Sequence, residues 1–171
     1  NITSSRFLVF GVKGMLSAAK NVRNAMLFNV LSFMSDKLLT VGNTVAALDE
    51  LYIWLSNPTA IEYIRNCLKR VRKKESAMLL ASQNLEDFDQ EGVREMTKPL
   101  FSIPPHQFLF NAGSIDKRSY MDMLQLEESE YNLIKFPQRG VCLYKCGNER
   151  YLLGVHAPAY KEKLFGTAGG R

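Results

Sequence analysis

Two short apolar runs that end abruptly in polar side chains constrain the fold of this chain more than any other feature of its sequence. The run at 44–48 is followed by the adjacent carboxylates of Asp49 and Glu50, and the run at 77–81 is followed by a polar cluster that includes Gln83. Each run has the length of a strand, and continuous apolar runs are typical of strands buried on both faces of a parallel sheet. We therefore expect two central strands with polar ends.

Helical patterns separate and flank these strands. Apolar residues recur at spacings of three and four from Met15 to about Leu39, which predicts a long helix. A second helix is expected to start at Asn57, as N-cap, and Pro58 and to run to about residue 74. Four more elements are predicted from apolar runs and turn signals: strands at 6–12 and 106–110, a weak helix at 85–97 and a short helix at 127–136.

The last part of the chain has a different pattern. Residues 140–158 alternate as two strands around Gly147 and Asn148, which predicts an antiparallel hairpin. The whole pattern favours an α/β fold: a mainly parallel sheet flanked by helices, with a C-terminal antiparallel hairpin, in a single domain over residues 1–171. The length of 171 residues and the 46% hydrophobic content fit one such domain. No uncharged apolar run reaches the roughly 18 residues that a membrane helix needs.

Ligands of parallel α/β sheets bind beyond the carboxyl ends of the strands. The polar residues that follow three predicted strands, Asp49 with Glu50, Gln83 and Asn111, would therefore line one edge. An apolar strand that ends in Asp-Glu has the Walker B arrangement, in which the first carboxylate holds Mg²⁺ and the second polarises the water that attacks the γ-phosphate. The alternative is a pair of loop carboxylates that cap the following helix.

Gln83 strengthens the first interpretation. In RecA-like ATPases a neighbouring strand ends in a polar residue that senses the γ-phosphate, and a glutamine amide can both donate to phosphate and accept from water. The alternative is an ordinary turn residue at the end of a strand.

A basic run follows the second helix. Five cations lie within six residues of the segment KRVRKKE, and Arg72 is among them. The simplest interpretation is a solvated helix end, where cations suit the helix dipole. In ring motors, however, an arginine at such an edge can reach the nucleotide of a neighbouring subunit as an arginine finger, because its fork binds two phosphate oxygens.

Taken together, the segments LDELYIWL, RNCLKRVRKKES and AMLLASQNLEDF resemble the motor ATPases of type IV secretion and conjugative DNA transfer, which are RecA-like. The resemblance continues through residues 108–165 and includes the strand and helix near the start of the chain. It implies that Asp49 is the metal ligand, Glu50 the catalytic carboxylate, Gln83 the phosphate sensor and Arg72 the finger.

The resemblance also implies cofactors, partners and a location. A full-length parent protein would use ATP and Mg²⁺, form a hexameric ring and contact other proteins of the secretion machine, with DNA as a further candidate partner. It would lie in the cytoplasm at the inner face of the cell membrane, held there through its partners. No tightly bound cofactor is expected on this chain itself.

One motif of such motors is missing. The chain has no G-x-x-x-x-G-K-[ST] phosphate loop, and Gly11–Gly14, with the sequence GVKG, does not supply one. We therefore expect the chain to be the C-terminal portion of a RecA-like motor domain, inactive by itself. The alternative, from a different functional class, is a self-standing α/β interaction module that binds protein or nucleic acid through its basic helix.

Overall fold

The computed structural model describes residues 6–55, 57–83, 85–88, 92–111, 113, 115–136 and 138–166. The chain divides into two compact units, Asn1–Ile103 and Pro104–Arg171, and each is described by itself. The α/β class and the mixture of a parallel pair with an antiparallel hairpin are confirmed. The organisation as a single domain stays a prediction.

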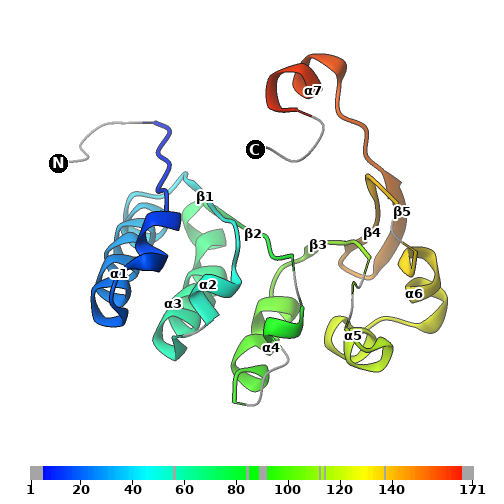
Figure 1. Ribbon diagram of the computed structural model, residues 1–171, viewed down its shortest axis with the longest axis horizontal. Helices are drawn as coiled ribbons and strands as arrows, with labels where there is room; N and C mark the ends of the chain where they lie inside the picture. Colours follow the sequence, from blue (N-terminus) through cyan, green and yellow to red (C-terminus); the bar gives the residue numbers. More distant parts are fainter. Residues whose placement is uncertain are drawn as a thin grey trace. The chain divides into compact units, whose positions relative to one another are not determined.

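The first unit holds a parallel pair of strands with the helices that precede and follow each strand (Figure 1). Its elements in chain order are η1 (Lys13–Ser17), α1 (Lys20–Asp36), η2 (Lys37–Val41), β1 (Val45–Leu48), α2 (Tyr52–Leu55), α3 (Pro58–Arg70), η3 (Val71–Lys74), β2 (Ala77–Leu80), η4 (Glu86–Phe88) and α4 (Arg94–Ser102).

Strands β1 and β2 pair in parallel, as predicted. Val45 lies opposite Ala77, and the register continues to Leu48 opposite Leu80. Parallel strands need a crossover between them, and α2 and α3 provide it. Because the two strands run the same way, the residues that follow them emerge at the same edge of the pair.

The core of this unit lies between the long helices. α3 begins where the sequence predicts, since the Asn57 side chain accepts a hydrogen bond from the Thr59 amide at 3.0 Å and Pro58 is the first helical residue. Its apolar stripe, which includes Ile61 and Ile64, is buried, as is Leu31 of α1. Full burial of one such side chain contributes about 1.5–3 kcal/mol. This packing holds the crossover helix, and with it both strand ends, in place.

Two predictions about strands of this unit are wrong. Residues 6–12 form no strand, and Phe7 and Val9 are 82% and 78% exposed. A strand needs a neighbouring backbone to pair with, and no described segment pairs with this one. Nor are β1 and β2 buried on both faces: exposure alternates along them, and Val45 and Leu79 are 67% and 62% exposed.

Two predicted helices are interrupted. The helix expected from Met15 to Leu39 is divided into η1, α1 and the π-helical turn η2. A π-turn here brings Gly42 into reach of Lys37, whose carbonyl accepts the Gly42 amide at 2.9 Å. The helix expected at 85–97 is represented by the short η4 and by α4, which runs further than predicted; residues 89–91 lie outside the described part of the chain.

The second unit is built around a three-stranded antiparallel sheet in the order β3-β4-β5 (Figure 1). Its elements are β3 (His106–Leu109), α5 (Lys117–Leu124), α6 (Glu128–Ile134), β4 (Val141–Cys146), β5 (Glu149–Gly154) and α7 (Ala159–Phe165). The predicted hairpin is confirmed, as is a short helix within 127–136. The patterns of α5 and α7 gave no prediction.

The expectation that β3 is a third strand with the same parallel pairing is wrong. β3 pairs antiparallel with β4, with Phe108 opposite Tyr144. The rings of these two residues stack with centroids 4.7 Å apart, and such cross-strand aromatic pairs stabilise a sheet. The hairpin therefore provides β3 with its backbone partner.

Polar contacts in this unit tie helices to strands. Lys145 is buried and donates to the Leu124 carbonyl at the end of α5 at 2.6 Å, and burial lowers the pKa of its ammonium group. Glu130 caps the start of α6 and also lies 3.0 Å from the Arg150 guanidinium on β5. These ionic groups therefore have structural roles. None of the helices in the described part of the chain has the length and apolar character that crossing a membrane requires.

Candidate functional site

Asp49 and Glu50, the acidic pair, bulge out of the parallel ladder between β1 and the strand that pairs with it. Both backbone groups of Ala81 bond to the residues that flank the pair: the Ala81 amide donates to the Leu48 carbonyl, and the Ala81 carbonyl accepts the Leu51 amide, each at 2.9 Å. Asp49 and Glu50 are thus left outside the ladder while the residues on either side are held. This arrangement places two carboxylates at the carboxyl edge of β1 without disturbing the strand.

The backbone at the acidic pair is unusual. Glu50 has φ of +51°, in the left-handed region that non-glycine residues rarely adopt. The Glu50 amide donates to Asp49 Oδ1 at 3.0 Å, and the Glu50 carbonyl accepts the Ile53 amide at 3.0 Å as the chain turns into α2. Leu51, at 3% exposure, and the buried residues of α2 anchor the turn from behind. The apolar residues that follow the carboxylates are therefore core, and the carboxylates face solvent.

Gln83 meets Glu50 directly. The Gln83 Nε2 group donates to Glu50 Oε1 at 2.6 Å, although the two residues are 33 positions apart in the chain. The prediction that Asp49, Glu50 and Gln83 gather at one edge is confirmed by this contact and by the parallel pairing of β1 with β2. Their chemical roles stay predictions.

Arg72 lies elsewhere. It is an exposed residue of η3, which precedes β2, whereas Gln83 follows β2. The four residues of β2 span roughly 13 Å at about 3.3 Å per residue. Arg72 is therefore at the amino edge of the strand pair, and the structure does not bring it to the acidic pair of its own chain.

Sequence reasoning missed the hydrogen bonds that hold this amino edge. The Lys74 carbonyl accepts the Asn43 amide at 2.9 Å, and Ser76 Oγ accepts the Thr44 amide at 3.2 Å. Gly42, with φ of +79°, approaches so closely that a Cβ would lie 2.8 Å from the Lys74 oxygen. The break at 41–43 was visible in the sequence, but its partner 32 residues away was not.

Asn111 does not belong to the candidate site as described. Its Nδ2 group donates to the carbonyls of Ile134 and Lys135, at 3.1 and 2.8 Å, at the end of α6. Its Oδ1 accepts the Gly113 amide. Both ends of the side chain are thus used within the second unit, and the amide satisfies helix carbonyls that would otherwise lack partners.

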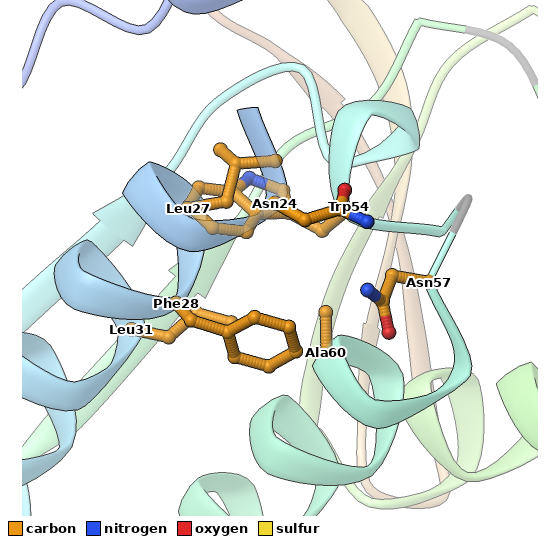
Figure 2. Close-up of a pocket in the computed structure, with 7 residues that line it drawn as sticks. All are labelled: Asn24, Leu27, Phe28, Leu31, Trp54, Asn57 and Ala60. Carbon is orange, nitrogen blue, oxygen red and sulfur yellow. The ribbon is translucent and has the colours of Figure 1, made fainter. Parts of the chain in front are cut away.

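A small cavity lies between α1, α2 and α3 (Figure 2). Its volume of about 10 Å³ is close to the minimum for one water molecule and far below that of a nucleotide site. The lining residues are mostly apolar: Asn24, Leu27, Phe28, Leu31, Trp54, Asn57 and Ala60. The cavity lining includes none of Asp49, Glu50 and Gln83.

The donor set at the carboxyl edge fits Mg²⁺ in one specific way. The adjacent carboxylates of Asp49 and Glu50 supply the hard oxygen ligands that Mg²⁺ prefers. In the described part of the chain, no group of three or more His, Cys, Asp or Glu side chains is placed to hold a metal. Such a pair suits an ion held by one or two carboxylates and by the phosphates of a bound nucleotide, rather than an ion enclosed by protein.

Comparison with known proteins gives two kinds of relative. No protein-family model matches the chain. Over 101 residues, 58% of this chain, it is 32% identical to a probable conjugal transfer protein TrbE of Sinorhizobium fredii and 31% identical to the conjugal transfer protein TrbE of Rhizobium radiobacter. The solved structure of VirB4 of Thermoanaerobacter pseudethanolicus matches 94% of this chain with a TM-score of 0.82 and 30% identity.

The chain spans only part of each relative: 15% and 12% of the two TrbE proteins and 44% of the VirB4 chain. The TrbE matches rest on sequence, and the VirB4 match rests on both fold and sequence. The resemblance to the proteins of conjugative transfer and type IV secretion, which the order of the motifs indicated, is confirmed by these matches.

Proposed function

From this likeness to a section of the TrbE and VirB4 proteins, we propose that the chain forms the water-activating and phosphate-sensing edge of an ATP-hydrolysing motor that energises type IV secretion or conjugative transfer. One observation carries the proposal: the hydrogen bond between Gln83 and Glu50 at the carboxyl edge of two parallel strands. This is where α/β folds bind their ligands. Phosphoryl transfer depends on positioning and charge, which such an edge provides.

The roles follow from the chemistry of each side chain. Asp49 would hold Mg²⁺, which when bound neutralises charge on the phosphates. Glu50 would accept a hydrogen bond, and then a proton, from the attacking water. Gln83 would contact the terminal phosphate with its amide. Leu51 is buried beneath the pair and bonded to Ala81, which holds the two carboxylates at the edge.

Arg72 would act on a neighbouring subunit. Because it precedes β2, whereas Gln83 follows β2, it would face away from the nucleotide at the carboxyl edge of its own chain. A ring of subunits would present it to the adjacent site as an arginine finger. The hexameric ring, contacts with other secretion proteins and with DNA, and a cytoplasmic position at the inner face of the membrane are parts of the same proposal.

The test is ATP hydrolysis by the full-length parent protein. Glu50→Gln keeps the size of the side chain but removes the carboxylate, and general-base catalysis contributes about 10²–10⁴-fold. We expect turnover to fall by that factor while nucleotide binding is retained. Asp49→Asn should instead raise the Mg²⁺ concentration that half-maximal turnover requires, because one carboxylate ligand is lost. Full turnover by Glu50→Gln would contradict the proposal.

The 171-residue chain by itself should show negligible ATP hydrolysis. It contains no phosphate loop, so the cradle that positions the phosphates is missing. Magnesium-dependent turnover by the purified chain that Glu50→Gln abolishes would contradict this expectation.

A second candidate function rests on the exposed cations of α3 and η3. Lys69, Arg70, Arg72, Lys73 and Lys74 are all exposed at one end of the helix. An interaction module would use this basic surface to bind an acidic protein or nucleic acid without nucleotide. Salt-sensitive binding of DNA by the isolated chain, lost in a variant with all of these cations changed to alanine, would favour it.

A further inference from the structure

The contact between Gln83 and Glu50 assigns a second role to the glutamine. A phosphate sensor needs only to face the nucleotide, yet Gln83 already holds the carboxylate that would activate water, at 2.6 Å. The amide nitrogen has two hydrogens, so one can remain on Glu50 while the other faces a phosphate. The side chain is therefore able to connect the two groups.

The backbone around Glu50 places its carboxylate outside the ladder, where Gln83 can reach it. Its φ of +51° is costly for a glutamate, and the ladder bonds stop on either side of the acidic pair. Leu48 and Leu51 are fixed to Ala81, while the Glu50 carboxylate accepts its hydrogen bond from the Gln83 side chain. Gln83 lies two residues beyond Ala81, so the bonds that fix Ala81 also determine where the amide emerges.

From this geometry we infer that Gln83 is the positioning residue for Glu50: its amide orients the carboxylate for the attacking water, in addition to any contact with phosphate. The inference rests on the proposed function and deepens it, because it couples phosphate sensing to water activation through a single side chain. Loss of the amide should therefore harm turnover more than nucleotide binding. A displacement of about 1 Å in a catalytic group can cost on the order of 10²-fold in rate.

The first experiment uses the 171-residue chain without nucleotide, so its outcome does not depend on ATP hydrolysis. NMR would follow the side-chain amide protons of Gln83, with those of the exposed Gln138 as internal reference. In the wild type, we expect one Gln83 proton to lie downfield and to exchange with solvent at least about threefold more slowly than those of Gln138, because it is hydrogen-bonded.

Two variants separate the hydrogen bond from the general effect of charge. Glu50→Ala should return the Gln83 protons to the positions and exchange rates of Gln138. Asp49→Asn removes a neighbouring charge but keeps the oxygen that accepts the Glu50 amide, and it should leave Gln83 unchanged. Equal shifts in both variants, or a Gln83 signal indistinguishable from that of Gln138 in the wild type, would overturn the inference while leaving the proposed function standing.

The second experiment measures binding and turnover separately in the full-length parent. For Gln83→Ala, we expect kcat to fall by about 10²-fold while the Kd for ATP changes by less than about threefold. Gln83→Asn should rescue poorly, because its amide is one methylene shorter. A raised Kd with unchanged kcat would mean that Gln83 contacts phosphate only, and would overturn the inference.

Discussion

The two edges of the β1–β2 pair are built on opposite principles. At the amino edge, backbone groups and one serine hydroxyl join residues 42–44 to residues 74–76, and a glycine fits where no side chain has room. At the carboxyl edge, the two backbone bonds of Ala81 enclose the acidic pair, the pair itself faces solvent, and the further contact across the strands joins two side chains, Gln83 and Glu50. Hydrogen bonds therefore join the two segments at the amino edge, whereas the carboxyl edge leaves polar side chains accessible to a ligand.

Under the proposed function, this difference would let one chain contribute to two nucleotide sites. An arginine finger must be held at a fixed position, because its effect depends on reaching a neighbouring phosphate with the correct geometry. Arg72 is followed within four residues by the bonds of Lys74 and Ser76, which fix the end of η3. Under the proposed function, the acidic pair and Gln83 would instead serve the nucleotide at the chain's own edge. Four predictions test this division, from the largest expected effect to the smallest.

The largest effect is expected for Arg72→Ala in the assembled parent. If the arginine acts on the neighbouring site, ATP turnover should fall by about 10³-fold or more with little change in folding or nucleotide binding. Arg72→Lys should rescue poorly, because a point charge does not reproduce the fork. Arg70→Ala, two residues earlier in the same basic run, is the matched control. Equal and small losses of ATP turnover in both variants would mean that the basic run is only a solvated surface.

Gly42→Ala should destabilise the first unit by about 2–3 kcal/mol, because two unfavourable effects combine. The new Cβ would lie 2.8 Å from the backbone oxygen of Lys74, and φ of +79° already disfavours a side chain. Gly92→Ala is the matched control, since Gly92 has φ of +80° but no atom within 4 Å of the place where a Cβ would lie. Denaturant unfolding of both variants isolates the cost of the collision. Equal losses would mean that the close approach at the amino edge contributes nothing.

Ser76→Ala should cost about 1–2 kcal/mol, because it removes a buried hydroxyl that accepts the part-buried Thr44 amide and leaves that donor without its partner. Ser82→Ala, at the carboxyl edge, changes an exposed serine and should stay within about 0.5 kcal/mol. Urea unfolding of both variants checks this. A larger fall in the midpoint for Ser82→Ala than for Ser76→Ala would contradict the proposed difference between the two edges.

The smallest effect compares two glutamates in the left-handed conformation, one at each edge. Glu50 and Glu75 have φ of +51° and +53°. Glycine relieves this conformation, so Glu75→Gly should raise the free energy of unfolding by about 0.5–1 kcal/mol. Glu50→Gly should gain less, because it also loses the bond from Gln83. A larger gain at Glu50 than at Glu75, measured by urea unfolding, would show that this bond stabilises nothing in the folded chain.

Much of the candidate site could be read from local patterns. Apolar runs of strand length, each followed by polar residues, indicated β1, β2 and the acidic edge, because strand length and the point where a strand ends are properties of short segments. The start of α3 at Asn57 and Pro58 was equally clear, since capping depends on adjacent residues. The hairpin of β4 and β5 followed from its two-residue turn.

Pairing and contact could not be read in this way. Residues 6–12 have the composition of a strand but no described partner, and β3 has the same kind of pattern but pairs with β4 rather than in parallel. Composition indicates that a segment can form a strand, whereas the hydrogen bonds that form between strands depend on which segment lies beside it in the fold. The wrong prediction that β1 and β2 are buried on both faces has the same cause. Apolar residues indicate a surface that can be buried but not which element covers it.

The chemical groups of this protein were therefore set by local sequence: two adjacent carboxylates after one strand, an amide after another, and an arginine before it. Their relations were decided by the tertiary fold. Parallel pairing brought Glu50 and Gln83 into contact across 33 residues and left Arg72 at the opposite edge. The physical reason is that a strand's direction decides which of its ends meets which neighbour, and direction is fixed only when the crossover helix packs against the core.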